Sequence, residues 1–291
     1  MLIGGAVFEQ LTGKTIYSAL LNDIARPIGM QDYLMENQTP WVLNDRDKWH
    51  GFEDIEDDYV MLDPIKLTIL TPGIDDDGKL LQTGGIPAAI VSNFLIKHNI
   101  VCEKTDYYSF LLLNSLGTTR AKQGSLLAAL FEFKKLYDSE TPLEAVFPEL
   151  VNNHPERYRG ETLKSHCEAM HSYLRENKIM ELMHNSFEVI PVPAMLPVEA
   201  AAHVVRGNVE MVDVAELNNR TVAVMLVPYP PGIPVMMGGE TMSGEAEAIA
   251  EYLLAREKFE NEFPGYEGDI HGITREQRGD RIVFRTLCIK K

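Results

Sequence analysis

The residues of this chain best suited to bind a charged ligand are Glu103, Lys104 and Thr105. They follow residues 100–102, a short apolar run that predicts a buried strand, and precede a second predicted strand at 107–113. A charge at the end of a buried strand needs a partner or a ligand, because an unpaired desolvated charge is costly. We therefore expect Glu103 either to pair with Lys104 or to receive a cationic ligand group.

Strand geometry bears on the choice between these two roles for Glu103. Adjacent strand residues point to opposite faces, so Glu103 and Lys104 are not expected simply to neutralise one another.

Trp49 and His50 are a second candidate pair, next to Gly51. Both residue types are intermediate in burial, so the pair fits a core beside a turn or the wall of a cleft.

Several other chemistries lack the motifs that they need. None of the eight histidines stands in an HExxH pattern, and His166 and His171, five apart on a predicted helix, point in different directions. No metal site is therefore expected. A GxSxG elbow, a GxGxxG loop and a Walker loop are all missing from the sequence, and no catalytic residue is assigned. Residues 75–78, Asp-Asp-Asp-Gly, lack the other ligands of a calcium loop and predict a turn.

The segments that must position Glu103 have the order strand, helix, strand, strand, helix. The first strand is expected at residues 61–70, and the helices at residues 86–97 and 119–137. This order suits a small α/β domain with helices on one face of a sheet. Elsewhere we expect helices at 8–25, 161–187 (one or two), 198–206 and 243–262, strands at 209–212 and 220–226, and a hairpin at 269–289.

The proline-rich stretch at residues 227–234 stands apart from these elements. It carries four prolines in seven residues, so it has few conformations to lose. We expect a rigid surface passage that joins no regular ladder.

Composition bounds the class of protein. The chain has 291 residues, 45% of them hydrophobic and 24% charged, which suits one large domain or two ordinary ones. Lys plus Arg number 27 and Asp plus Glu number 43, giving a net charge of −16. That excess argues against nucleic acid or an anionic membrane as a partner. Three scattered cysteines, no membrane-length apolar run and no secretory signal indicate a cytoplasmic protein.

A set of short blocks carries a family resemblance. The chain resembles the carboxy-terminal part of the bacterial ornithine/lysine/arginine decarboxylases, which are pyridoxal-phosphate enzymes of the aspartate-aminotransferase fold type. The blocks are Trp-His-Gly-Phe at 49–52, Met-Leu-Asp-Pro-Ile-Lys at 61–66, Thr-Pro-Gly at 71–73, Gly-Ile-Pro-Ala at 85–88, Glu-Lys-Thr at 103–105, Arg-Gly-Asn-Val-Glu at 206–210, Pro-Tyr-Pro-Pro-Gly at 228–232 and Phe-Pro-Gly-Tyr at 263–266. They occur in family order over nearly the whole chain.

The resemblance implies a fold and a domain division. The fold class would be α/β (α+β), a small α/β domain of a pyridoxal-phosphate enzyme followed by the family's mixed α+β carboxy-terminal domain. Residues 1–48 would be a remnant of the large cofactor domain with a linker, 49–145 the small domain, and 146–291 the carboxy-terminal domain.

The resemblance also implies an activity, the decarboxylation of a basic amino acid to an amine in polyamine metabolism or acid resistance. Glu103, Lys104 and Thr105 would lie near the substrate's distal cationic group. The Glu-Lys-Thr block and the proline-rich block look most like the lysine members, with ornithine next, whereas Gly238-Gly239-Glu240 leans toward the arginine members.

One departure from the family pattern qualifies that activity. The chain has no Ser-x-His-Lys segment, so the lysine that holds pyridoxal phosphate is not in this sequence. We expect the chain alone to be inactive, as a truncated or split member that works in a homo-oligomer (dimer or higher) or with an upstream cofactor-domain chain. The alternative is a non-catalytic subunit or regulator that binds full-length decarboxylases.

Overall fold

The computed structural model describes residues 42, 56, 60, 61, 63, 65–75 and 79–291. Its contacts divide the chain into two compact units, Met1–Ser172 and Tyr173–Lys291. The domain boundaries expected after residues 48 and 145 stay predictions. The helix expected at 8–25 lies outside the described residues.

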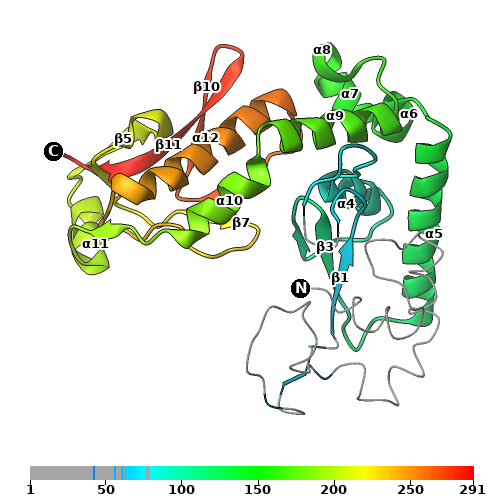
Figure 1. Cartoon of the computed structure of the whole chain (residues 1–291), viewed down its shortest axis with the longest axis horizontal. Coiled ribbons are helices and arrows are strands. Elements are labelled where there is room, and N and C mark those ends of the chain that lie inside the picture. Colours follow the sequence, from blue (N-terminus) through cyan, green and yellow to red (C-terminus); the bar gives the residue numbers. More distant parts are fainter. Residues whose placement is uncertain (1–41, 43–55, 57–59, 62, 64, 76–78) are drawn as a thin grey trace. The chain divides into compact units, whose positions relative to one another are not determined.

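The described part of the first unit contains a three-stranded antiparallel sheet in the order β1 (Lys66–Leu70), β3 (Ser109–Leu113), β2 (Lys104–Thr105) (Figure 1). The register places Ile69 of β1 opposite Phe110 of β3, and both side chains are buried. Leu112 is buried on the same face as Phe110, two residues along the strand. This alternation gives the sheet one apolar face for helices to cover.

The strand expected at residues 100–102 is wrong. Those residues are outside any strand, and the chain forms only the two-residue edge strand β2, at Lys104–Thr105. Asn99, with a φ of 59°, turns the chain after the preceding helix, and Val101 is then 76% exposed. A run of three apolar residues cannot reveal whether it lies in a sheet or on the surface. Glu103 therefore precedes a short edge strand and does not end a buried one.

Two helices of the first unit follow their predicted positions. Helix α4 (Ala88–Lys97) starts just after Pro87. Helix α5 (Arg120–Asp138) is capped by Thr119, whose side chain accepts a hydrogen bond from the Lys122 N–H. The rings of Phe94 on α4 and Phe133 on α5 meet edge to face, with centroids 5.3 Å apart. This aromatic contact joins the two helices.

Four further helices complete the first unit: α6 (Leu143–Val146), α7 (Pro148–Asn153), α8 (Pro155–Tyr158) and α9 (Leu163–Glu176), the last of which runs past Ser172. Proline occupies the first turn of α7 and of α8, where its missing N–H costs nothing. The His166 and His171 side chains of α9 are both buried.

The second unit has a mixed α and β content. Its elements are α10 (Ile179–Glu188), β4 (Val192–Pro193), α11 (Pro197–Val205), β5 (Val209–Asp213), η4 (Val214–Glu216), β6 (Arg220–Thr221), β7 (Val227–Tyr229), β8 (Glu240–Met242), η5 (Gly244–Ala246), α12 (Glu247–Glu262), β9 (Asp269–His271), β10 (Thr274–Arg278) and β11 (Arg281–Ile289). They form sheets in the orders β10-β11-β5 and β4-β8-β6 and the pair β7-β9.

Helix α12 packs against strand β11 to make the core of the second unit (Figure 1). Ile249 and Leu253 of α12 and Phe284 of β11 are fully buried in one apolar cluster. The Glu260 carboxylate at the end of α12 is also fully buried, and Arg275 of β10 donates two hydrogen bonds to it, of 2.6 and 2.8 Å. The buried charge is thus paired, as its burial requires.

The proline-rich stretch corrects one expectation. Residues 227–229 form strand β7 and pair with β9, with Pro228 opposite Ile270, so the prediction that this stretch joins no ladder is wrong. A two-stranded ladder tolerates proline because each strand has only one neighbour to bond. The strand expected at 220–226 is shorter than predicted, since only Arg220 and Thr221 form β6.

Candidate functional site

Glu103 lies on the surface beside the edge of the first unit's sheet. Its backbone N–H donates to the Leu111 carbonyl at 2.8 Å, which fixes the main chain next to β3. Its side chain is exposed, and none of the described residues pairs with the carboxylate. The Glu103 carboxylate is therefore carried by a main chain that is held in place, and it is accessible to a cationic group.

Helix α4 anchors the residues on either side of this carboxylate. The Thr105 hydroxyl donates to the Ser92 hydroxyl of α4 at 2.9 Å, and Ser92 is buried. Burial raises the pKa of the Cys102 thiol, although a hydrogen bond with Ser92 opposes the shift. The exposed Lys104 pairs in register with Leu111, and no ion pair joins it to Glu103 in the described part of the chain.

The structure therefore brings Glu103, Lys104 and Thr105 together at one sheet edge, and their roles in binding a substrate stay predictions. Trp49 and His50 lie outside the described residues. Among the residues that are described, no three His, Cys, Asp or Glu side chains gather as a metal ion would need. None of the helices described has both the length and the apolarity to cross a bilayer.

Tyr108, which lies just before strand β3, belongs to a buried hydrogen-bond network with His171. Tyr108 and His171 are joined by a 2.6 Å hydrogen bond between the tyrosine hydroxyl and Nδ1, and Nε2 of His171 lies 2.9 Å from the Leu81 carbonyl. A carbonyl only accepts, so Nε2 carries the proton and Nδ1 accepts from Tyr108. His166 belongs to another network, with its Nδ1 2.8 Å from Glu161.

Sequence reasoning did not predict the contact between Tyr108 and His171. Two glycines were the signal in the sequence, because a Cβ at Gly85 would overlap the His171 ring and a Cβ at Gly73 would overlap Tyr108. Both glycines stand in blocks that carry the family resemblance. Close approach of a ring explains why these positions lack a side chain.

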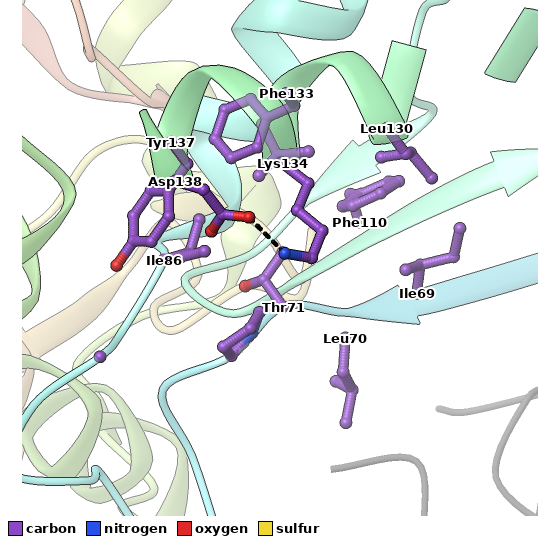
Figure 2. A pocket seen from close by; sticks show the side chains of 13 residues that line it. Ile69, Leu70, Thr71, Ile86, Phe110, Leu130, Phe133, Lys134, Tyr137 and Asp138 are labelled. Atoms are coloured by element: carbon purple, nitrogen blue, oxygen red, sulfur yellow. Dashed lines mark hydrogen bonds and ion pairs between the residues drawn. The ribbon is translucent and has the colours of Figure 1, made fainter. Parts of the chain in front are cut away.

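A cavity of about 230 Å³ opens between the sheet and helix α5 (Figure 2). Its apolar wall includes Ile69 of β1, Phe110 of β3 and Leu130 of α5. Thr71 lies with Lys134 and Asp138, which form an ion pair, on the other side of the cavity. The cavity is therefore apolar at one end and polar at the other.

Comparison with known families matches most of the chain. Residues 11–122 match the model of the Orn/Lys/Arg decarboxylase major domain, and residues 180–290 match that of the Orn/Lys/Arg decarboxylase C-terminal domain. This chain belongs to the Orn/Lys/Arg decarboxylase family. The recognition made from the sequence blocks is thereby confirmed, and so is the mixed α and β fold class.

Individual members of the Orn/Lys/Arg decarboxylase family agree with that assignment. The chain is 45% identical to the lysine decarboxylase LdcA of Pseudomonas aeruginosa over 251 residues, which are 86% of this chain and 33% of that protein. It is 37% identical to the biodegradative arginine decarboxylase of Escherichia coli over 256 residues, 87% of this chain and 33% of that protein. The chain thus spans about a third of the length of these relatives.

Solved structures of the same family share the fold. Lysine decarboxylase A from Pseudomonas aeruginosa superposes with a TM-score of 0.79 at 44% identity, covering 87% of this chain and 34% of that one. The constitutive lysine decarboxylase of Escherichia coli gives a TM-score of 0.79 at 36% identity, over 86% of this chain and 35% of that one. These relatives are named as decarboxylases of lysine and of arginine, two amino acids with cationic side chains, so Glu103, with its exposed carboxylate, is the first residue to test.

Proposed function

We propose that this chain forms the carboxy-terminal part of a pyridoxal-phosphate-dependent decarboxylase that converts lysine to its diamine and carbon dioxide. The observation that carries the proposal is the 45% identity to a lysine decarboxylase over 86% of the chain. Ornithine and arginine are the next substrates in order, because family members for both are similar to this chain.

Glu103 is the residue that we assign to substrate selection. Its accessible carboxylate would accept a charge-assisted hydrogen bond from the distal ammonium of lysine, and such bonds are stronger than neutral ones. The hydrogen bond from the backbone of Glu103 to Leu111 and the one from Thr105 to Ser92 hold the main chain on both sides of Lys104. A positioned carboxylate discriminates by the length of the substrate's side chain.

The described residues do not themselves fit the cofactor. Pyridoxal phosphate would supply an electron sink for loss of carbon dioxide, and it requires an attachment lysine and donors for its phosphate. The cavity in the first unit has an apolar wall, and the one lysine that lines it, Lys134, is paired with Asp138. We therefore assign no cofactor contact to the described part of the chain.

A chimera tests the proposed function. The matching carboxy-terminal third of the Pseudomonas aeruginosa lysine decarboxylase is replaced by residues of this chain, and carbon dioxide release is measured with lysine, ornithine and arginine. We expect decarboxylation with the highest kcat/KM for lysine, with the unaltered enzyme as the control. Sedimentation measures whether the working enzyme is a homo-oligomer.

Two outcomes would contradict the proposal in different ways. A folded, cofactor-loaded chimera that decarboxylates none of the three amino acids would remove the catalytic assignment. If the separate chain then bound a complete decarboxylase, its role would be that of a non-catalytic partner. A preference for arginine or ornithine would overturn the substrate and leave the reaction in place.

A further inference from the structure

The cavity beside helix α5 has the lining of a binding site for a small molecule. Ile69, Phe110 and Leu130 are each at most 5% exposed, so the apolar end is part of the core of the first unit. Thr71 and the Lys134–Asp138 pair lie at the other end (Figure 2). Ligand sites are typically apolar hollows with a few placed polar groups, and this cavity has that composition.

Thr71 supplies the observation that points to a ligand. The residue is only 7% exposed, and its side-chain hydroxyl is buried without a hydrogen-bond partner. The Thr71 backbone N–H, by contrast, has a partner, because it donates a hydrogen bond to the Tyr108 carbonyl at 2.9 Å. Buried polar groups are nearly always bonded, so this hydroxyl of a cavity-lining residue is available for a hydrogen bond with a water or a ligand.

The charges at the polar end restrict the kind of ligand. Lys134 and Asp138 neutralise one another across one turn of α5, so this pair offers no net charge to an ion. Tyr137 also lines the cavity, and burial, with the nearby Cys167 and Glu168 next, raises its pKa to about 12. The tyrosine is therefore neutral under ordinary conditions, and an uncharged polar group is the best match.

The size of the cavity limits the body of the ligand. A cavity of roughly 150 Å³ in another protein holds benzene, so the volume of about 230 Å³ here accepts a ring with small substituents. We propose that this cavity binds a small uncharged amphiphile, with an aromatic or alicyclic ring toward Phe110 and one hydroxyl or N–H group toward Thr71. The site is separate from the proposed substrate carboxylate, Glu103, and requires no catalytic activity.

The test uses the full 291-residue chain and four ring compounds of one shape. These are 4-methylphenol, its hydrocarbon match 1,4-dimethylbenzene, and two charged matches, 4-methylbenzoate and 4-methylbenzylamine. Titrations follow the backbone amide resonances of the isotope-labelled chain. We expect 4-methylphenol to shift amides around Thr71, Leu130 and Tyr137 and to bind about 3- to 10-fold more tightly than the hydrocarbon, the effect of one hydrogen bond.

Three variants show whether the Thr71 hydroxyl causes that preference. Thr71→Val keeps the shape and should abolish the difference between 4-methylphenol and the hydrocarbon, whereas Thr71→Ser should retain it. Thr68→Val is the matched control, because Thr68 is a buried threonine of β1, three residues before Thr71, that does not line the cavity. Its amide spectrum and ligand preference should match those of the parent chain.

Several results would overturn the proposal. They are no binding by any compound, equal affinity for the phenol and the hydrocarbon, tighter binding of a charged compound, or amide shifts confined to other parts of the chain. Thermal unfolding with and without 4-methylphenol gives a second measurement, because a ligand bound to the folded state must raise Tm. A chain that lacks decarboxylase activity but passes this test would leave the proposed site intact.

Discussion

The Tyr108 hydroxyl donates a 2.6 Å hydrogen bond to Nδ1 of His171, a residue 63 positions further along the chain. Both side chains are buried, and their rings meet edge to face at 5.8 Å. The bond joins the segment before strand β3 to helix α9. It therefore links the sheet edge that carries Glu103 to the helical end of the first unit.

Tyr108→Phe should lower the free energy of unfolding by about 1–3 kcal/mol, because it leaves a buried acceptor on His171 without its donor. Chemical denaturation of the chain measures the change. Tyr229→Phe is the control, since that tyrosine is 38% exposed, and it should change stability by less than about 0.5 kcal/mol. Equal effects of the two substitutions would show that the bond to His171 adds little.

Gly85→Ala should destabilise the chain by about 1–3 kcal/mol, the usual cost of overpacking a filled core. A Cβ at this position would overlap the His171 ring, which is held by hydrogen bonds on both nitrogens. Gly124→Ala is the matched control within helix α5, where a Cβ would meet nothing within 4 Å. It should stabilise the chain by roughly 0.5–1 kcal/mol, because alanine favours a helix.

Thermal and chemical unfolding of the two glycine variants should thus shift in opposite directions. If Gly85→Ala were as stable as the parent chain, the contact between Gly85 and His171 would be loose and would not explain why position 85 lacks a side chain.

Glu161 should give the first unit an acid-sensitive contribution to stability. Burial alone would raise the pKa of Glu161, but hydrogen bonds and charges from His166 and Arg157 outweigh it and hold the pKa below its ordinary value. A depressed folded pKa means stability that is present above the unfolded pKa, about 4.3, and is lost as pH falls through the folded pKa.

Glu161→Gln tests this pH dependence. At pH 7 the substitution should lower the free energy of unfolding by about 1–3 kcal/mol, the scale of hydrogen bonds to a charged group. The gap between variant and parent should narrow as the pH falls below about 4.3. Glu149→Gln, at an exposed position, is the control. A gap of constant size at every pH would mean that the Glu161 charge is not responsible.

In an active chimera, Glu103→Gln should lower kcat/KM for the basic substrate by a factor that corresponds to about 1–3 kcal/mol. The loss should fall mainly on KM, because the group binds the distal end of the substrate. Glu144→Gln, an exposed glutamate of α6 in the same unit, is the control. Unchanged kcat/KM in the Glu103 variant would remove this residue from the site.

Periodic segments of the sequence could be predicted, whereas contacts between distant residues could not. Helix α5 follows from apolar residues at helical spacing, and that signal lies within about twenty residues of sequence. The strand expected at residues 100–102 is wrong because its three apolar residues carry no period. Whether a short segment forms a strand depends on the strands it pairs with, and a local sequence pattern carries no information about them.

The candidate site, like the fold, could be predicted only in part from the sequence. The Glu-Lys-Thr block is visible in the sequence, but it was expected at the end of a buried strand, whereas Lys104 and Thr105 form a short edge strand, and its role stays a prediction. The cavity next to Thr71 could not be predicted, because its wall comes from β1, β3 and α5 together. A hydroxyl without a partner is a property of packing that residue types alone do not reveal.

The central place of strand β11 has a consequence for synthesis of the protein. Strand β11 lies between β10 and β5, and Arg285 of β11 contacts Asp213 of β5 across 72 residues of sequence. Pairings so far apart form slowly, because a long loop must close before any contact compensates for it. Strand β5 therefore leaves the ribosome well before its neighbour exists. Until residues 281–289 have emerged, the edge of β5 that later pairs with β11 is open to pairing with other chains.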